Sequence, residues 1–218
     1  MVSEVLARVE GVCGELVLRR VGPHHEIIAN GVFLMDTRNG ESERLMVAAA
    51  ADRMPAGATM LIGGLGVGFS LREALDHPRV GSIVVVEREA AVLDWNRTVL
   101  GNAGVLADPR VRVVRDDLLA WLPAAGRFGA LCLDIDNGPE WTVDDGNASL
   151  YGRAGLAMID DALAPGGVLA VWSAGRAPAF AAALAERYGP VETLEIPVPR
   201  GEPDLVFLVT RSRSGSGD

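Results

Sequence analysis

From residue 59 onward the chain alternates between short apolar runs and amphipathic stretches. The apolar runs, rich in Val, Ile and Leu, cover residues 59–62, 82–86, 111–114, 130–133 and 168–172, and the amphipathic stretches include 71–75, 90–100, 118–122 and 151–163. Short continuous apolar strands separated by helices predict a parallel sheet that is covered by helices on both faces. This part of the chain is therefore predicted to form a doubly wound α/β domain.

Two further β-like runs, residues 191–196 and 205–210, follow each other without a helix between them. Their connection contains Pro197, Pro199 and Pro203, and two strands joined by a short connection pair antiparallel. A mostly parallel sheet that ends in an antiparallel hairpin is typical of the Rossmann-like, seven-stranded class I methyltransferase fold. That is the α/β fold we predict.

The chain before residue 58 shows a different pattern. Asn30-Gly31 is a tight-turn signal, and an apolar helical run extends from Ser42 to Ala51. Short strands are predicted at residues 15–19, 26–29 and 32–35. We therefore divide the chain into a small N-terminal β lid (1–41), a main domain (42–211) and a Ser/Gly-rich tail (212–218) that we expect to be disordered.

The amino-acid composition limits the kinds of ligand and partner that the protein is expected to bind. With 218 residues, of which 49% are hydrophobic and 22% charged, the chain can bury a core without a disulfide or a metal. Its 20 Lys and Arg against 29 Asp and Glu give a net charge of −9, which disfavours nucleic acid and favours a neutral or cationic small substrate. Cys13 and Cys132 are the two cysteines, and no apolar stretch approaches the roughly 20 residues of a membrane span. We expect a cytoplasmic protein that binds no membrane.

A glycine-rich turn is the strongest local signal. It follows the first apolar run directly, precedes a helical stretch, and contains Gly63, Gly64, Gly66 and Gly68. Glycine permits positive φ and lets a ligand approach the main chain, while a helix N-terminus offers free amide donors. We predict that this turn binds a cofactor; tight strand-to-helix packing is the alternative.

Acidic residues follow the next two apolar runs. Glu87 ends the second run, 19 positions after Gly68, where a carboxylate can accept hydrogen bonds from both hydroxyls of a ribose. The third run is followed by Asp116 and Asp117, and an acid there can accept from the adenine amino group or cap the helix that starts at Leu118. We expect one aspartate of the pair to bind adenine and the other to cap.

The fourth apolar run delivers Asp134 and Asp136 to the same edge of the predicted sheet, followed by Trp141. Ligands of open α/β sheets bind outside the carboxyl ends of the strands, so Asp134 is expected to face the reacting centre. Both aspartates are candidate catalytic groups, and Trp141 could face a substrate or form part of the pocket wall. His24-His25 has no Asp, Glu or Cys partner at metal-ligand spacing, and we expect no metal.

These motifs resemble those of the spermidine synthase-like proteins, within the class I S-adenosylmethionine (AdoMet)-dependent methyltransferase superfamily. The resemblance rests on residues 61–72, 84–87, 111–122, 131–139, 150–151 and 163–173. It implies that residues 42–211 form an AdoMet-binding domain, that the glycine turn passes under the amino-acid part of the donor, and that Glu87 holds the ribose. It also implies that Asp117 with Leu118 flanks adenine, because Asp117 matches the family's acid five places before a Leu.

The resemblance gives two further residues a role. Asp134 matches the first acid of the family's Asp-x-x-Asp gate, which in polyamine synthases helps to take a proton from the attacking amine. Tyr151 lies in a matching segment and is assigned, with Asp136 and Trp141, to the substrate.

The chain departs from the polyamine synthases in several places. Their turn reads Gly-Gly-Gly-Asp-Gly-Gly, and its acid meets the free amine of decarboxylated AdoMet, whereas this turn has no acid. The gate is one residue shorter, and Leu34 or Met35 stands where the family's lid has a glutamine. The missing acid favours AdoMet as the donor, although Asp36 or Glu43 could replace it from the lid.

Our leading hypothesis from the sequence is therefore an AdoMet-dependent methyltransferase that acts on a small acceptor such as an amine. The first alternative is a polyamine aminopropyltransferase that uses decarboxylated AdoMet. The second is a non-catalytic nucleoside-binding module. Apolar residues on the lid hairpin are compatible with a homodimer.

Overall fold

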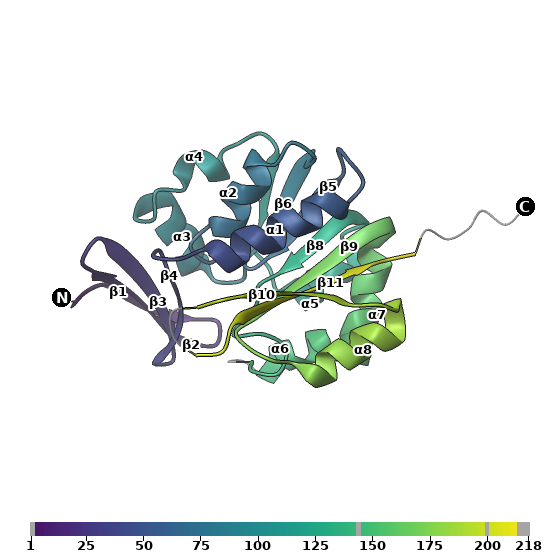
Figure 1. Cartoon of the computed structure of the whole chain (residues 1–218). Coiled ribbons are helices and arrows are strands. Elements are labelled where there is room, and N and C mark those ends of the chain that lie inside the picture. Colours follow the sequence, from purple (N-terminus) through teal and green to yellow (C-terminus); the bar gives the residue numbers. More distant parts are fainter. Residues whose placement is uncertain (1–2, 143–144, 199–200, 213–218) are drawn as a thin grey trace, which may run out of the picture.

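The computed structural model describes residues 3–142, 145–198 and 201–212. Two sheets organise the chain: a large one in the main body and a small one beside it, near the N-terminus (Figure 1). Most of the predicted tail, residues 213–218, lies outside the described residues. In the part of the chain that is described, no helix is both long enough and apolar enough to cross a bilayer.

The large sheet has seven strands, in the order β10-β11-β9-β8-β5-β6-β7. The five strands β5 to β9 run parallel to one another. Strand β11 pairs antiparallel with both β9 and β10. The strands are β5 (Thr59–Gly63), β6 (Ser82–Val86), β7 (Val111–Val114), β8 (Phe128–Leu133), β9 (Leu163–Ser173), β10 (Glu192–Ile196) and β11 (Asp204–Thr210). This topology confirms the predicted class I methyltransferase-like fold.

Helices cover both faces of this sheet, as the continuous apolar runs predicted (Figure 1). One face carries α1 (Glu41–Arg53), α2 (Phe69–Asp76), α3 (Ala90–Thr98) and α4 (Ala103–Leu106), and the other carries α5 (Leu118–Trp121), α7 (Arg153–Ala162) and α8 (Pro178–Tyr188). Successive residues of β5 serve the two cores in turn: Met60 and Ile62 pack with the first set, and Leu61 with the second. A 3-10 turn (Leu122–Ala124) and α6 (Asp145–Tyr151) complete the elements.

The small sheet is an antiparallel meander of β1 (Ser3–Gly11), β2 (Gly14–Val21), β3 (His24–Ala29) and β4 (Val32–Asp36). Its first strand was not predicted. Asn30 and Gly31 both have positive φ, 50° and 79°, as the tight turn between β3 and β4 requires. Leu16, Leu18 and Ile27 join the core on the α1 side of the large sheet, so the lid is packed onto the main body.

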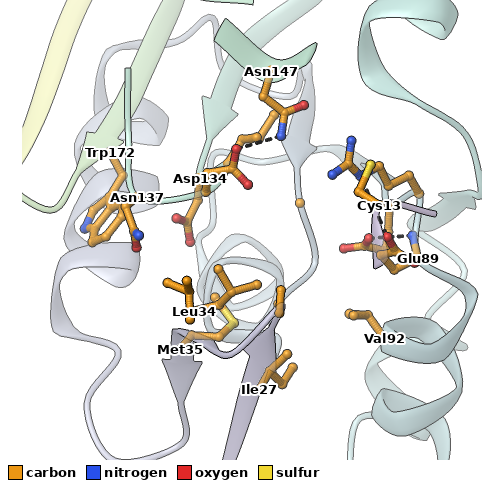
Figure 2. A pocket seen from close by; sticks show the side chains of 18 of the residues that line it. Cys13, Ile27, Leu34, Met35, Glu89, Val92, Asp134, Asn137, Asn147 and Trp172 are labelled. Atoms are coloured by element: carbon orange, nitrogen blue, oxygen red, sulfur yellow. Dashed lines mark hydrogen bonds and ion pairs between the residues drawn. The ribbon is translucent and has the colours of Figure 1, made fainter. Parts of the chain in front are cut away.

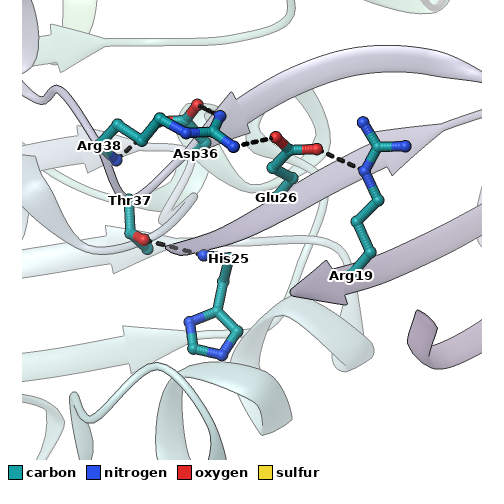
Figure 3. Close-up of polar contacts among 6 residues, drawn as sticks. All are labelled: Arg19, His25, Glu26, Asp36, Thr37 and Arg38. Carbon is teal, nitrogen blue, oxygen red and sulfur yellow. Dashed lines mark hydrogen bonds and ion pairs between the residues drawn. The ribbon is translucent and has the colours of Figure 1, made fainter. Parts of the chain in front are cut away.

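A charged cluster fixes the end of the lid sheet (Figure 3). Glu26 is 5% exposed and is paired with Arg19 and Arg38, and Arg38 is also paired with Asp36. Burial alone would raise the pKa of Glu26, but its hydrogen bonds to Arg38 and Arg19 outweigh burial and lower this pKa. The backbone N–H of His25 donates to Thr37 Oγ1 over 3.0 Å, and together these contacts hold β4 in place.

Candidate active site

A cavity of about 630 Å³ lies between the lid and the carboxyl edge of the large sheet. Its wall combines residues of the lid strands, the glycine turn, the ends of β6 to β9, and the first residues of α1 and β11. This volume falls within the range of about 300–1,000 Å³ that is usual for small-molecule sites. Figure 2 shows side chains from the lid, such as Met35, opposite Asp134 from the sheet.

The glycine turn lies at the centre of this wall. Gly64 has φ +89°, its N–H donates to Val86 O over 3.0 Å, and a Cβ built on it would lie 2.6 Å from the carbonyl oxygen of Asp134. Gly64 and Gly66 line the cavity. Gly63 is the last residue of β5, packed against Leu133, and Gly68 is the N-cap residue of α2, so packing and helix initiation explain these two glycines.

We expect Gly64→Ala to destabilise the protein more than Gly57→Ala does. Both glycines have positive φ, +89° and +74°, but a Cβ on Gly57 meets nothing within 4 Å. Gly57→Ala should therefore lower the free energy of unfolding only by the cost of a left-handed backbone at alanine, about 1–2 kcal/mol. The alanine at 64 adds a clash with the Asp134 carbonyl, for about 1–3 kcal/mol more. Urea unfolding measures both, and equal losses would contradict the close approach that we describe.

Two buried asparagines hold the turn from behind, and the sequence analysis did not identify them. Asn96 Nδ2 donates to the carbonyl of Gly66 over 2.8 Å, and Asn102 Nδ2 donates to the carbonyl of Val67 over 2.9 Å. Both side chains are fully buried. Buried amides with satisfied hydrogen bonds fix a backbone in one conformation, so the turn is preorganised.

Glu87 connects the turn to the end of β6. One of its carboxylate oxygens accepts from Leu65 N over 3.0 Å, and the other accepts from Glu89 N over 2.8 Å. The residue is 8% exposed and lines the cavity. Burial raises the pKa of Glu87, although the two backbone hydrogen bonds oppose this rise. Each oxygen has a further lone pair, so the carboxylate can still accept from a ribose.

Glu89, two residues further on, holds the lid over this end of the cavity. Its carboxylate oxygens accept from the backbone N–H of Val12, in the turn between β1 and β2, over 3.0 and 3.1 Å. Figure 2 shows Glu89 beside Cys13, and both residues line the cavity. The turn between β1 and β2 is therefore connected, through the short loop of residues 87–89, to Glu87, the residue predicted to bind the ribose.

Of the two aspartates after β7, it is Asp117 that caps the following helix. Asp117 is the N-cap of α5: its Oδ1 accepts from Ala120 N over 3.1 Å. Asp116 Oδ1 accepts from Asp117 N over 2.8 Å. Both aspartates line the cavity, together with Leu118. A carboxylate has two oxygens, so the cap on Asp117 is compatible with a hydrogen bond to adenine, which stays a prediction.

Asp134 lies directly after β8 and lines the cavity. Its backbone N–H donates to Gly63 O over 3.1 Å, while its carboxylate receives no hydrogen bond from any described residue. Burial raises the pKa of Asp134 well above its usual range, and the nearby carboxylates of Glu43 and Asp204 raise this pKa further. An unpaired carboxylate with a raised pKa in a cavity is a candidate general base.

Glu43 and Asp204 were not among the site residues predicted from the sequence. Burial raises the pKa of both, and Asp204 contributes to the raised pKa of Glu43. Asp204 could have been anticipated: β11 runs antiparallel to β9, so its first residue, rather than its last, meets the carboxyl edge of the parallel strands. Glu43 was considered as a replacement for the missing acid, and the structure places it on the wall.

The loop after Asp134 carries Asp136 and Trp141, and the third predicted substrate residue, Tyr151, ends α6. Asp136 has φ +55°, an uncommon conformation for a residue other than glycine, and its Oδ2 accepts from Asn147 Nδ2 over 2.8 Å. Trp141 lines the cavity and is 61% exposed. Tyr151 is not among the lining residues: its hydroxyl donates to the carbonyl of Ile135 over 3.4 Å from behind, so it supports the loop.

A lid methionine packs closely against the glycine turn. A Cβ built on Gly66 would lie 2.3 Å from the sulfur of Met35. A side chain at residue 66 would therefore require the end of Met35 to move, so the glycine lets the lid lie close to the turn.

The cavity is strongly acidic. Its described lining contains ten carboxylates and one arginine, Arg88: the acids are Glu15, Asp36, Glu43, Glu87, Glu89, Asp116, Asp117, Asp134, Asp136 and Asp204. Six of them form no ion pair with a described Lys, Arg or His: Glu43, Glu87, Asp116, Asp117, Asp134 and Asp204. This electrostatic field favours cationic ligands and disfavours a free carboxylate. The described residues contain no group of three or more His, Cys, Asp or Glu side chains placed to hold a metal ion.

A seven-stranded sheet of this topology, with a cavity at its carboxyl edge, defines a class I methyltransferase-like protein. Comparison of the sequence with known families is more specific, because residues 40–179 match the spermine/spermidine synthase domain. The chain belongs to this family.

Individual relatives agree with the family. A polyamine aminopropyltransferase of Mycobacterium tuberculosis (strain CDC 1551 / Oshkosh) is 36% identical over 166 residues, which cover 72% of this chain and 30% of that protein. Putrescine N-methyltransferase 3 of Nicotiana tabacum is 31% identical over 141 residues, 62% of this chain and 36% of that protein. The chain thus spans about a third of the length of these relatives. Spermidine synthase from Thermotoga maritima has the same fold, with a TM-score of 0.76 and 17% identity, over 97% of this chain and 74% of that chain.

Proposed function

We propose that the chain transfers an aminopropyl group from decarboxylated AdoMet to an amine. The acidic cavity is the observation that carries this proposal: ten carboxylates surround a space in which the described wall offers one arginine. AdoMet brings a carboxylate into such a site, whereas its decarboxylated form keeps the ammonium and the sulfonium without the carboxylate and is therefore more cationic. Membership of the spermine/spermidine synthase family supports the same reaction.

This proposal reverses the order of our first two hypotheses. The missing turn acid favoured AdoMet and methyl transfer, but the structure places Glu43, Asp134 and Asp204 on the wall of the same cavity. The relative with the higher identity is a polyamine aminopropyltransferase, and the putrescine N-methyltransferase is matched over a smaller part of this chain. Methyl transfer to an amine is the second candidate, favoured by the absence of an acid from the sequence of the glycine turn.

The residues that would hold the donor follow the strand ends. Glu87 would accept from the ribose, Asp117 and Leu118 would flank the adenine, and Gly64 and Gly66 would let the chain of the donor pass close to the backbone. Bound there, the donor supplies a sulfonium-activated carbon: the amine nitrogen forms a C–N bond while the C–S bond breaks, and sulfur keeps the electron pair as a neutral thioether. Alignment of the two reactants supplies most of the rate enhancement.

Asp134 would take the proton of the attacking amine. Its carboxylate is unpaired within the described chain and lies close enough to Glu43 and Asp204 for their charges to raise its pKa. A base with a raised pKa is better matched to an amine near neutral pH than an ordinary aspartate is. Asp136, on the loop after Asp134, is held by Asn147 of α6 and would attract the cationic acceptor.

Donor preference tests the proposal. Isothermal titration calorimetry should show that decarboxylated AdoMet binds at least about 10-fold more tightly than AdoMet, because a free carboxylate meets uncompensated negative charge. With an amine acceptor, the reaction should release 5′-methylthioadenosine, which chromatography detects. Preference for AdoMet with release of S-adenosylhomocysteine would support methyl transfer instead. Tight donor binding with no transfer to a broad panel of amines would support the non-catalytic alternative.

A further inference from the structure

The turn between β1 and β2 covers the end of the cavity at which the nucleoside is predicted to bind. Cys13 and Gly14 of this turn line the cavity together with Glu87 and Glu89, which follow β6. Strand β6 is separated by β5 from β8, the strand that leads to Asp134. A nucleoside held at Glu87 would therefore lie next to the lid turn, and the turn has to move before such a ligand can enter or leave.

The carboxylate of Glu89 holds this turn in place. The backbone N–H of Val12 is shared between the two oxygens of Glu89, over 3.0 and 3.1 Å. The approach is close, because a Cβ built on Gly11 would lie 2.7 Å from Glu89 Oε2. The side chain of Val12 is 64% exposed and adds little apolar burial to this contact. The hydrogen bond from the lid backbone to Glu89 therefore makes a major contribution to holding the turn.

Glu89 also occupies a position from which it could cap its own helix. It is the N-cap residue of α3, with φ −85° and ψ 111°, yet in the described chain its side chain makes no hydrogen bond to the amides of that helix. N-cap side chains normally accept from the second or third amide of the helix. If the lid turn moves away, these amides are a second set of donors for the same carboxylate. Glu89 therefore has two alternative partners, as a two-state element requires.

The backbone of Glu89 connects the lid contact to the predicted ribose acid. Glu89 N donates to Glu87 Oε1 over 2.8 Å, and Leu65 N of the glycine turn donates to Glu87 Oε2 over 3.0 Å. The contact with Glu87 uses the main chain of residue 89, whereas the contact with the lid uses its side chain. A substitution at residue 89 can therefore release the lid while the amide that holds Glu87 is kept.

We propose that Glu89 is a positioning residue that controls nucleoside exchange: its carboxylate holds the β1–β2 turn closed over the cavity and moves to the amides of α3 when the turn opens. The inference rests on the proposed function only in so far as the ligand is a nucleoside. Opening precedes both entry and release, so a weaker contact with Val12 accelerates both steps. Glu89 takes no part in the bond that forms or in the bond that breaks.

Side-chain length separates the two partners of Glu89. Glu89→Asp keeps the charge and creates a preferred N-cap, but it is one methylene shorter, so the contact with Val12 is lost. Glu89→Gln keeps the length, and its carbonyl oxygen can still accept from Val12 N. In the ligand-free protein, hydrogen exchange at the Val12 amide should be about 10- to 100-fold faster in Glu89→Asp, the size of one charge-assisted hydrogen bond. The increase should be smaller in Glu89→Gln and absent from Asp94→Asn, an exposed control on α3.

Stopped-flow fluorescence tests the exchange step without turnover, with Trp141 of the cavity wall as the signal. Glu89→Asp should raise both the association and the dissociation rate constant of 5′-methylthioadenosine by about 10-fold, and Glu89→Gln should lie between this variant and the unchanged chain. Damage to the site would slow association instead of speeding it. The direction of the change therefore distinguishes control of the lid from a merely structural role.

Gly11→Ala disturbs the same contact from the lid side, because its Cβ meets the Glu89 carboxylate. Gly104→Ala, whose Cβ meets nothing within 4 Å, is the matched control. Gly11→Ala should accelerate nucleoside exchange on its own and add little to Glu89→Asp. Association rates that stay unchanged in both Glu89→Asp and Gly11→Ala would overturn the inference. Accelerated exchange without aminopropyl transfer to any amine would refute the proposed function and leave this inference standing.

Discussion

The Asp134→Asn variant is expected to lose about 100- to 10,000-fold in kcat, the usual contribution of a general base. Asparagine keeps the shape of the side chain but cannot take a proton from the acceptor. Because the thioether product is neutral, its binding does not depend on the charge at residue 134. We therefore expect 5′-methylthioadenosine to bind within about 3-fold of its affinity for the unchanged chain, as measured by calorimetry.

The same substitution should not destabilise the protein. Burial and the neighbouring carboxylates raise the pKa of Asp134, so between the ordinary and the raised value the folded chain binds more protons than the unfolded chain does. Ionisation of Asp134 therefore lowers the free energy of unfolding as the pH rises through this interval. Asparagine removes that cost. At pH 7 the variant should have a melting temperature equal to or above that of the unchanged chain.

Asp161→Asn provides the matched control, because Asp161 is an exposed residue of α7 away from the cavity wall. It should leave both kcat and nucleoside binding unchanged. A normal kcat for Asp134→Asn would remove Asp134 from the mechanism. A large loss of stability would instead show that its carboxylate has a structural partner.

Glu87→Gln is expected to weaken nucleoside binding by about 10- to 100-fold, the equivalent of one charge-assisted hydrogen bond. The buried carboxylate of Glu87 is an acceptor only, whereas a glutamine amide presents two N–H donors to the ribose and to the backbone. Calorimetry with 5′-methylthioadenosine measures the loss. Asp94→Asn, at an exposed position on α3, is the control and should bind normally.

A double-mutant cycle separates the ribose contact from a general effect on the glycine turn. The 2′-deoxy analogue of 5′-methylthioadenosine lacks one of the hydroxyls that Glu87 is predicted to bind. If the contact exists, Glu87→Gln should cost less affinity for this analogue than for the parent compound. Identical losses for the two ligands would mean that Glu87 acts only by holding Leu65 and Glu89.

The sequence predicted the main sheet well because its strands are buried on both faces and therefore read as continuous apolar runs. The predicted ranges 82–86 and 111–114 coincide with β6 and β7. The strand missed, β1, is mostly exposed, and Glu4, Arg8 and Glu10 interrupt it, so no burial pattern marks it. The helix α8 was also missed; it is alanine-rich and contributes few large apolar residues, with Phe180 and Leu184 buried.

The cavity wall was predicted less completely than the fold. Glu87, Asp117 and Asp134 could be found because each follows a recognisable strand, and the structure brings all three to one cavity. Asp204 follows a proline- and glycine-rich loop and precedes its strand, so a rule based on strand ends overlooks it. The role of Tyr151 behind the loop depends on a tertiary contact with Ile135 that no local pattern encodes.

Because β11 runs antiparallel to its neighbours, Asp204 and the groups predicted to bind the nucleoside come from opposite ends of their strands. Groups predicted to recognise the nucleoside follow strands that run one way, whereas Asp204 reaches the same space from the start of a strand that runs the other way. We therefore expect substitutions at the start of β11 to change which acceptors the cavity binds without disturbing the strands that are predicted to hold the adenosine. If the proposed function holds, acceptor specificity could change in evolution while the residues that hold the donor stay the same.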